Sequence, residues 1–253
     1  MVNKWIPYPR YIFRKEIALS LIRKYIPQKG SFLEIGCASG NFGITLSQMG
    51  YKGHLIDFSP QAINYLKNSF EGNTESLTFE QADFEEFRTD AKFDLIILFE
   101  VLEHIENDTA VLEKICGLLT DNGFLLCSVP ARKKLWASSD EFAGHKRRYE
   151  KKEIANLLDK NSFSIRKFYS YGFPWLNVIK IFRDMVATKQ MKILSNKTET
   201  ELTQQSGMNP LKIKMPFFKL VMNRYFWYIF IKFSLLFNDL DLAEGYLILA
   251  NKK

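Results

Sequence analysis

The segment from Phe32 to Gly43 constrains the fold of this chain more than any other. An apolar run ends in Gly36, and Gly40 and Gly43 follow before an amphipathic stretch begins. This order predicts a strand, a tight turn and a helix, which together make the βα unit that binds adenosine-containing cofactors. Glycine suits the turn because a residue without Cβ can bend sharply and approach a ligand closely.

The details of the turn differ from a dinucleotide site. Such sites require G-x-G-x-x-G, whereas Ala38 occupies the place of the second glycine and Glu34 lies inside the end of the strand. The pattern Glu-x-Gly-x-x-x-Gly-x-x-Gly resembles motif I of the class I S-adenosylmethionine (SAM) methyltransferases. The resemblance implies that Glu34 orients the amino-acid part of SAM and that Gly36, Cys37 and Gly40 run beneath it.

Acidic residues also follow the later predicted strands. The second strand ends in Asp57, about 20 residues beyond the glycines, where a carboxylate can accept hydrogen bonds from two ribose hydroxyls. The third strand leads into Asp83 and the fourth into Glu100. In the family that this pattern resembles, the third acid caps the adenine amino group and its neighbour packs on the ring. The further cofactor contacts implied here are Asp57, Phe58, Asp83, Phe84 and Phe99.

Apolar periodicity and turn residues predict one α/β domain. The chain has 253 residues, of which 47% are hydrophobic, enough for a single core of this class. We expect a Rossmann-like, seven-stranded methyltransferase sheet with helices on both faces, whose last strand, by the same resemblance, lies antiparallel beside the sixth. Strands are expected near 32–35, 52–56, 77–81, 93–99, 124–130, 162–171 and 245–250, helices near 11–26, 41–50, 60–70, 107–119 and 151–160, and a turn at 121–123.

Four parts follow along the chain. They are an N-terminal cap helix (1–30), the SAM-binding core (31–173), a helical acceptor-binding or lid insertion between strands six and seven (174–242), and the final core strand (243–253). The cap helix either closes over the bound molecules, with Tyr11 contacting the acceptor, or simply packs on the sheet.

The insertion has three compositions. Residues 175–192 are expected to be helical, residues 195–209 form a polar loop, and residues 210–237 are apolar on nearly all sides. A segment of the last kind must be buried or face lipid. It therefore either caps a hydrophobic acceptor pocket or lies in a membrane interface, with its cations near anionic headgroups.

Two of the three histidines lie where chemistry is expected. Glu100, Glu103 and His104 form E-x-x-E-H after the fourth strand, and positions i, i+3 and i+4 share one face of a helical turn. His145 lies in the run Gly-His-Lys-Arg-Arg-Tyr. Two carboxylates and two imidazoles can hold a divalent cation that leaves positions open for substrate oxygens. Alternatively, His104 or His145, with Glu100 nearby, acts as a metal-free base for a hydroxyl proton.

The E-x-x-E-H run resembles two groups of metal-using methyltransferases. They are the small-RNA 3′-terminal 2′-O-methyltransferases and the ubiquinone-pathway O-methyltransferases, and the resemblance implies Glu100, Glu103, His104 and His145 as metal ligands. Because many relatives carry Glu-Val-Leu-Glu-His without a known metal, we favour the histidine base and keep the divalent metal as the alternative.

The segment from 129 to 149 supplies the other expected acceptor contacts and resembles a branch of SAM methyltransferases with G-H-x-R-R-Y. Trp136 is expected to stack on the acceptor, and Arg148 to clamp a carboxylate or phosphate beside Tyr149. The alternative is that the arginines pair with nearby carboxylates on a solvated face.

Three function classes remain open from these residues. The first is a SAM-dependent methyltransferase that modifies a hydroxyl or carboxylate of a small apolar or lipid-linked acceptor and releases S-adenosylhomocysteine (SAH). The second is an RNA 2′-O-methyltransferase with a Glu/Glu/His/His metal site. The cations are dispersed and no RNA-binding module is visible, so nucleic acid is not the expected partner. The third is a non-catalytic SAM-binding subunit.

Composition narrows the setting. The formal charge of +7 suits anionic partners such as acidic lipids. The three cysteines lack disulfide or metal spacing, and we find no secretory signal and no apolar run long enough to span a bilayer. We therefore expect a cytoplasmic protein of a biosynthetic pathway that touches membranes peripherally through 210–237.

Overall fold

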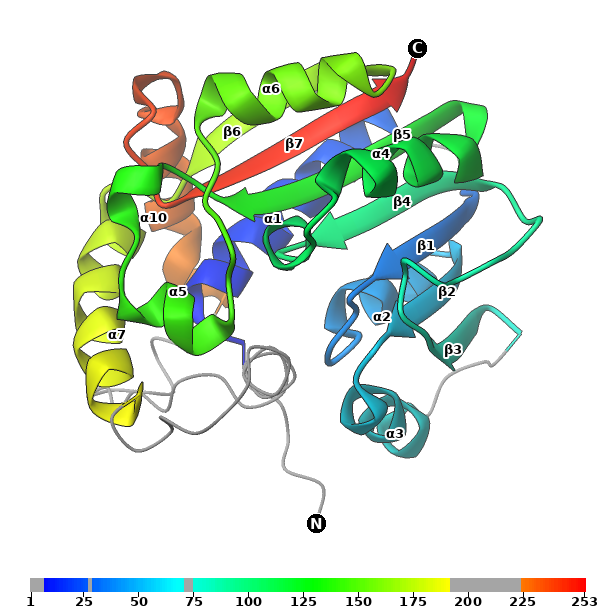
Figure 1. Cartoon of the computed structure of the whole chain (residues 1–253), viewed down its shortest axis with the longest axis horizontal. Helices are drawn as coiled ribbons and strands as arrows, with labels where there is room; N and C mark the ends of the chain where they lie inside the picture. Colours follow the sequence, from blue (N-terminus) through cyan, green and yellow to red (C-terminus); the bar gives the residue numbers. More distant parts are fainter. Residues whose placement is uncertain (1–6, 27–28, 71–74, 192–223) are drawn as a thin grey trace.

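A single seven-stranded sheet organises the computed structural model, which describes residues 7–26, 29–70, 75–191 and 224–253 (Figure 1). The strand order is β3-β2-β1-β4-β5-β7-β6. All neighbouring strands pair in parallel except β7, which is antiparallel to both β5 and β6. The strands are β1 (Ser31–Ile35), β2 (Lys52–Asp57), β3 (Leu77–Gln81), β4 (Phe93–Phe99), β5 (Leu119–Pro130), β6 (Phe163–Tyr171) and β7 (Gly245–Lys252). The predicted fold class and the antiparallel last strand are confirmed.

Helices cover both faces of this sheet. The helices described are α1 (Pro9–Tyr25), α2 (Asn41–Gln48), α3 (Pro60–Ser69), α4 (Asp108–Leu118), α5 (Ser138–Ala143), α6 (Lys151–Lys160), α7 (Trp175–Met191) and α10 (Arg224–Leu235), with short 3-10 turns η1 (Leu102–His104), η2 (Lys133–Leu135) and η3 (Asn238–Leu240). One apolar core packs α1, α2, α3 and α10 on one face, and a second packs α4 and α6 on the other. Because alternate strand residues point to opposite faces, Phe32 enters the first core and Leu33 the second.

Local sequence explains where several helices begin. Ser59 caps α3 by accepting a hydrogen bond from the Ala62 N–H, and Pro60 occupies the first helical position, where its missing N–H costs nothing. Asn107 caps α4 in the same way through the Ala110 N–H. Both helices therefore start within one residue of their predicted positions.

The expected turn at residues 121–123 is wrong. Strand β5 runs through these residues, because it begins at Leu119 rather than Phe124. Leu119 pairs with Phe93 and Phe124 with Leu95, so β5 uses five steps where β4 uses two. The excess residues form a bulge whose polar side chains, Asp121 and Asn122, are exposed. Turn-forming residues thus mark an irregularity inside one strand. The short helix α5 is likewise absent from the prediction.

The insertion between β6 and β7 contributes α7 and α10. The expected helix at 175–192 is present as α7, whereas residues 192–223 lie outside the described residues, and with them the predicted polar loop and the first part of 210–237. The rings of Trp175 and Phe230 lie 4.9 Å apart, and those of Phe13 and Trp227 lie 5.4 Å apart, so α10 packs against both α7 and α1. Among the described residues, no helix has the length and apolarity needed to cross a membrane.

Candidate functional site

The glycine turn lies at the carboxyl edge of the sheet, between β1 and α2. Gly36 has a φ of +69°, and a Cβ there would also lie 2.4 Å from the Val101 side chain. The Gly36 and Cys37 N–H groups both donate to the Ile56 carbonyl, at 2.9 and 3.1 Å. The turn is therefore fixed against β2 in a conformation that disfavours any side chain at position 36.

Asp57 lies at the end of β2 and supports the same turn. Its two carboxylate oxygens accept hydrogen bonds from the Ala38 N–H at 2.8 Å and the Ser59 N–H at 2.9 Å. The carboxylate is buried, and burial raises its pKa in spite of these hydrogen bonds. The position of Asp57 beside the turn fits the expected contact with ribose, because each of its carboxylate oxygens retains a second lone pair that can accept a hydrogen bond.

Glu34 lies behind the turn. Its Oε2 accepts a hydrogen bond from the Gly43 N–H at 2.9 Å, and a Cβ on Gly43 would lie only 2.6 Å from that oxygen. Burial raises the pKa of Glu34 to about 8, against the opposing effect of the Gly43 N–H. The third glycine of the motif is thus required by the approach of Glu34 to α2.

The residues expected around adenine differ in their exposure to solvent. Asp83 is exposed and Phe58 is half-buried, as a ligand contact requires. Phe84 is instead buried in the second core, stacked on Phe87 with the Lys114 ammonium over its ring. This geometry does not support the expectation that Phe84 packs on adenine, because Phe87 and Lys114 of α4 already contact its ring.

Phe99, at the end of β4, is also nearly buried. Its ring packs edge-on against Phe42 at 4.9 Å, and the Arg14 guanidinium lies 5.1 Å from its centroid. Phe99 therefore joins the glycine helix α2 to the cap helix α1. Tyr11 makes a second such link, because its hydroxyl donates to the Asn41 side chain at the start of α2.

The E-x-x-E-H run divides into two groups. Glu100, with a φ of +55°, turns towards α1, where its carboxylate lies 2.5 Å from Arg10 and 3.4 Å from Arg14 and accepts a hydrogen bond from Ser128. Burial alone would raise the pKa of Glu100, but the two arginines lower it to about 2. Glu100 is therefore an ionised partner of arginines, and the expectation that it joins the metal ligands or the base is not supported.

Glu103, His104 and His145 come together on the other side. Their possible ligand atoms all lie within 4.8 Å of one another. The Glu103 carboxyl is fully buried, and among the residues that the structure describes neither of its oxygens has a hydrogen-bond partner. Burial, and then the charge of Glu100, raises the pKa of Glu103 well above its usual range. His145 Nε2 lies 3.7 Å from the Glu103 carboxyl.

Two hydrogen bonds orient the imidazoles. His145 Nδ1 lies 2.9 Å from the Asp140 carboxylate, and His104 Nδ1 lies 2.9 Å from the Gly144 carbonyl. In each case the acceptor places the ring proton on Nδ1 and leaves Nε2 as the basic nitrogen. Burial lowers the pKa of both histidines, that of His104 to about 4, so both are neutral at physiological pH.

These residues fit a divalent cation as a three-ligand set rather than the predicted four. Two neutral imidazoles, each held through Nδ1, and one carboxyl group with no hydrogen-bond partner in the described part of the chain form a donor set that metals of the zinc, manganese and iron group accept. Glu100 is excluded from the set because two guanidinium groups already neutralise it.

The polar atoms of Arg148 and Tyr149, which are expected acceptor contacts, have partners inside the protein. Arg148 is buried, with its Nε 2.8 Å from Asp140 and its Nη1 2.8 Å from the Ala131 carbonyl. The buried Tyr149 hydroxyl donates to Asp108. This geometry does not support the expected acceptor contact of either residue, since their polar atoms are committed to partners around His145. Trp136, in contrast, is 41% exposed, and its stacking on an acceptor stays a prediction.

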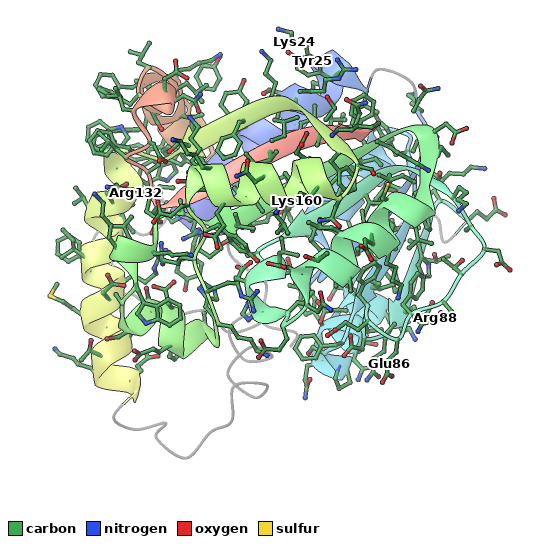
Figure 2. All side chains as sticks on the ribbon, turned by 45° about the horizontal axis from the view of Figure 1, so that its top comes forward. Lys24, Tyr25, Glu86, Arg88, Arg132 and Lys160 are labelled. Carbon is green, nitrogen blue, oxygen red and sulfur yellow. The ribbon has the colours of Figure 1, made fainter. Side chains whose placement is uncertain are left out.

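Sequence reasoning missed the partners of these groups. Asp140 lies five residues before His145, on a helix that was not predicted, and Gly144, with a φ of +74°, turns the chain back towards it. Arg10, Tyr171 and Glu244 come from three distant elements, and nothing local in the sequence pairs them. The labelled Arg132, which follows β5, and Arg88, which lies between β3 and β4, are on opposite sides of Figure 2.

The fold, the glycine turn with Asp57 and the histidine cluster define a Rossmann-like methyltransferase. The methyltransferase-domain family matches residues 8–167. The chain belongs to this family of SAM-dependent methyltransferase domains.

Individual relatives are more distant. The chain is similar to the ubiquinone biosynthesis O-methyltransferase of Rickettsia felis, with 27% identity over 106 residues, 42% of this chain and 43% of that protein. The match spans less than half the length of the first curated relatives. Among solved structures, it resembles the [4+2]-cyclase SpnF (TM-score 0.62, 13% identity, 94% of this chain and 80% of the other). It also resembles the SAH-bound magnesium protoporphyrin IX methyltransferase of Synechocystis PCC 6803 (TM-score 0.54, 17% identity, 68% and 85%). At these identities the likeness shows the fold alone.

Proposed function

We propose that this enzyme methylates an oxygen atom, a hydroxyl or a carboxylate, of a small apolar or lipid-linked acceptor, with His145 as the base for a hydroxyl. The observation that carries the proposal is the hydrogen bond between Asp140 and His145 at the carboxyl edge of β4 and β5. The similarity to ubiquinone biosynthesis O-methyltransferases also favours oxygen as the methylated atom.

Different residues bind the cofactor and accept the proton. SAM, when bound, supplies the methyl group on a positively charged sulfur. The glycine turn and Asp57 hold the cofactor on the β1–β3 half of the sheet edge. Asp140 keeps the proton of His145 on Nδ1, so that Nε2 can take the proton of an acceptor hydroxyl. A carboxylate acceptor would need no such proton transfer.

A metal-assisted form of the same reaction is the second candidate. The observation in its favour is the convergence of Glu103, His104 and His145. These residues would hold the cation, which would lower the pKa of an acceptor hydroxyl. The RNA 2′-O-methyltransferase alternative has no further support, because the metal set lacks Glu100.

Calorimetry and product analysis test the proposal together. We expect purified protein to bind SAM and SAH equally with and without EDTA, and labelled SAM to yield a methylated product in a lipid extract whose formation resists EDTA. Loss of product in EDTA, restored by Mg²⁺ or Mn²⁺, would favour the metal form. Absence of transfer to any hydroxyl or carboxylate compound would refute the proposal.

The acceptor class rests on the surface of the insertion. Along α7, the side chains of Val178, Ile181, Phe182 and Met185 recur at helical spacing and are all about half exposed or more. On α10, Tyr228, Ile229 and Phe233 are exposed beside the cation Lys232. An exposed apolar face with a lysine beside it suits the surface of an anionic bilayer. We propose that this face, rather than 210–237 alone, reaches a lipid-linked acceptor.

Vesicle binding should depend on that face. We expect the protein to sediment with phosphatidylglycerol-containing vesicles. The variant Phe182→Asp should bind these vesicles about tenfold more weakly, because a charge replaces an apolar side chain that the bilayer would bury. Asn64→Asp, an equal charge change on the exposed face of α3, should bind as the wild type does. Equal binding of all three proteins would contradict the membrane role.

A further inference from the structure

A buried charged cluster lies at the carboxyl ends of β4, β5 and β6 and the amino end of the antiparallel β7, beside the half of the sheet edge that carries the glycine turn. Arg10 of α1 lies 2.5 Å from Glu100 and 3.5 Å from Glu244. Glu244 also pairs with Arg183 of α7 at 2.5 Å, and Arg14 pairs with Glu100. Three ion pairs thus attach α1 to the edge of the sheet, at the place where an acceptor has to lie next to the methyl donor.

Several polar groups of this cluster are left without partners. Within the part of the chain that the structure describes, the Nε groups of Arg10 and Arg14 and the hydroxyl of Tyr171 are buried and have no hydrogen-bond partner. Tyr171 is fully buried at the end of β6, and its ring lies over Gly245, where a Cβ would be 2.9 Å away. Burial raises the pKa of Tyr171, so its hydroxyl remains a donor. Buried donors without acceptors are rare and call for a ligand or water.

The charges of the cluster do not balance. Three guanidinium groups, those of Arg10, Arg14 and Arg183, face two carboxylates, Glu100 and Glu244. Burial opposes ionisation of both acids, but the arginines lower the pKa of each, so both are charged.

The neighbouring groups do not remove this excess. Arg148 is paired with Asp140, and Lys180 with Asp184. Among the described residues, three guanidinium groups of the cluster therefore share two carboxylates and retain unused donors, and a buried charge without a full counterion is costly.

We propose that the Arg10, Arg14 and Tyr171 donors bind a carboxylate or another singly charged oxygen anion on the acceptor, which anchors the acceptor with its reacting oxygen near His145. The inference rests on the proposed function and narrows its acceptor to an anionic compound. An anion at this place would satisfy the donors and neutralise the cluster. No bond forms or breaks at the anchored group.

Tyr171→Phe tests the proposal sharply, because it removes only the unpartnered hydroxyl. Protein saturated with SAH is titrated by NMR with benzoate and with its neutral analogue benzyl alcohol. We expect benzoate to bind at least tenfold more tightly than benzyl alcohol, and Tyr171→Phe to weaken benzoate binding about fivefold with no loss of thermal stability.

Tyr246→Phe is the matched control. Tyr246 is also fully buried, but it belongs to the second core, and its hydroxyl donates to Asp241 at 2.6 Å. This variant should lose thermal stability and keep the benzoate affinity of the wild type.

The possible failures are distinguishable. If benzoate binds no better than benzyl alcohol, or if Tyr171→Phe leaves benzoate binding unchanged, water alone fills the cluster and the inference is overturned. If the protein does not bind SAH in the same samples, the proposed function fails instead.

Discussion

Replacement of His145 by alanine is expected to reduce the rate of methyl transfer about 100- to 10,000-fold, the range that loss of a general base costs. The reason is the geometry of its ring, whose Nδ1 is held by Asp140 and whose Nε2 is left basic. SAM affinity should not change, because His145 lies outside the glycine turn. The measurement is the initial rate of labelled methyl transfer from SAM to the lipid extract, with SAM affinity by calorimetry.

His54→Ala is the matched control for that variant. His54 lies in β2 and bonds to Thr78 and Glu80 of β3, away from the cluster, so its loss should leave the rate unchanged. Equal rates of methyl transfer for His145→Ala and the wild type would exclude His145 as the general base.

The pH dependence of methyl transfer follows from the lowered pKa of His145. Only neutral His145 can accept a proton, and burial places its pKa below 6.5 in spite of the raising effect of Asp140. Activity should therefore be constant at neutral pH and fall only as the pH drops through that lowered pKa. Asp140→Asn should lower the plateau, because the amide no longer fixes the tautomer, and should move the acid limb to lower pH, because a stabilising negative charge is lost. An unchanged pH profile in Asp140→Asn would contradict this positioning role.

Replacement of Asp57 by alanine is expected to weaken SAM binding about 100-fold. This is the effect of losing the two hydrogen bonds that we expect from ribose to the buried carboxylate. The same change removes the acceptor of the Ala38 N–H, so the turn beneath the cofactor also loses its support. Calorimetry with SAM and SAH measures the effect.

Asp94→Ala separates cofactor contact from general destabilisation. Asp94 also accepts hydrogen bonds from a backbone N–H and from hydroxyls, those of Ser31 and Thr120, but it lies at the amino ends of β1 and β4, opposite the cofactor. The Asp94→Ala variant should have a lower thermal stability but the SAM affinity of the wild type. If both variants bind SAM normally, Asp57 does not contact ribose.

The fold was predictable because its signals are local. Each predicted strand and most helices appear within a few residues of their expected positions, since apolar periodicity, caps such as Ser59 and the glycine turn act over short distances. The failed turn at 121–123 shows the limit of local signals. The preference of Asp-Asn-Gly for a turn is met by a bulge, because pairing with β4 holds the residues on either side in one strand.

The candidate site was predictable only in part, and residue type alone misplaced several of its members. Glu100 and Glu103 are three residues apart in one motif, yet the positive φ of Glu100 sends its carboxylate to the arginines of α1 while Glu103 stays with the histidines. Arg148 and Tyr149 have the chemistry of ligand contacts, but burial commits their polar atoms to Asp140 and Asp108.

The sequence by itself determined the cofactor half of this protein, because the strand, the glycine turn and the acid at the end of the next strand are defined by spacing along the chain. Only the tertiary structure decided the acceptor half. The ion pair between Arg10 and Glu244 joins residues 234 positions apart, and the arrangement of arginines around Tyr171 depends on how α1, α7 and β7 pack. Partners so distant in the chain are chosen by packing and by the cost of burying charge, and neither is encoded in a local pattern.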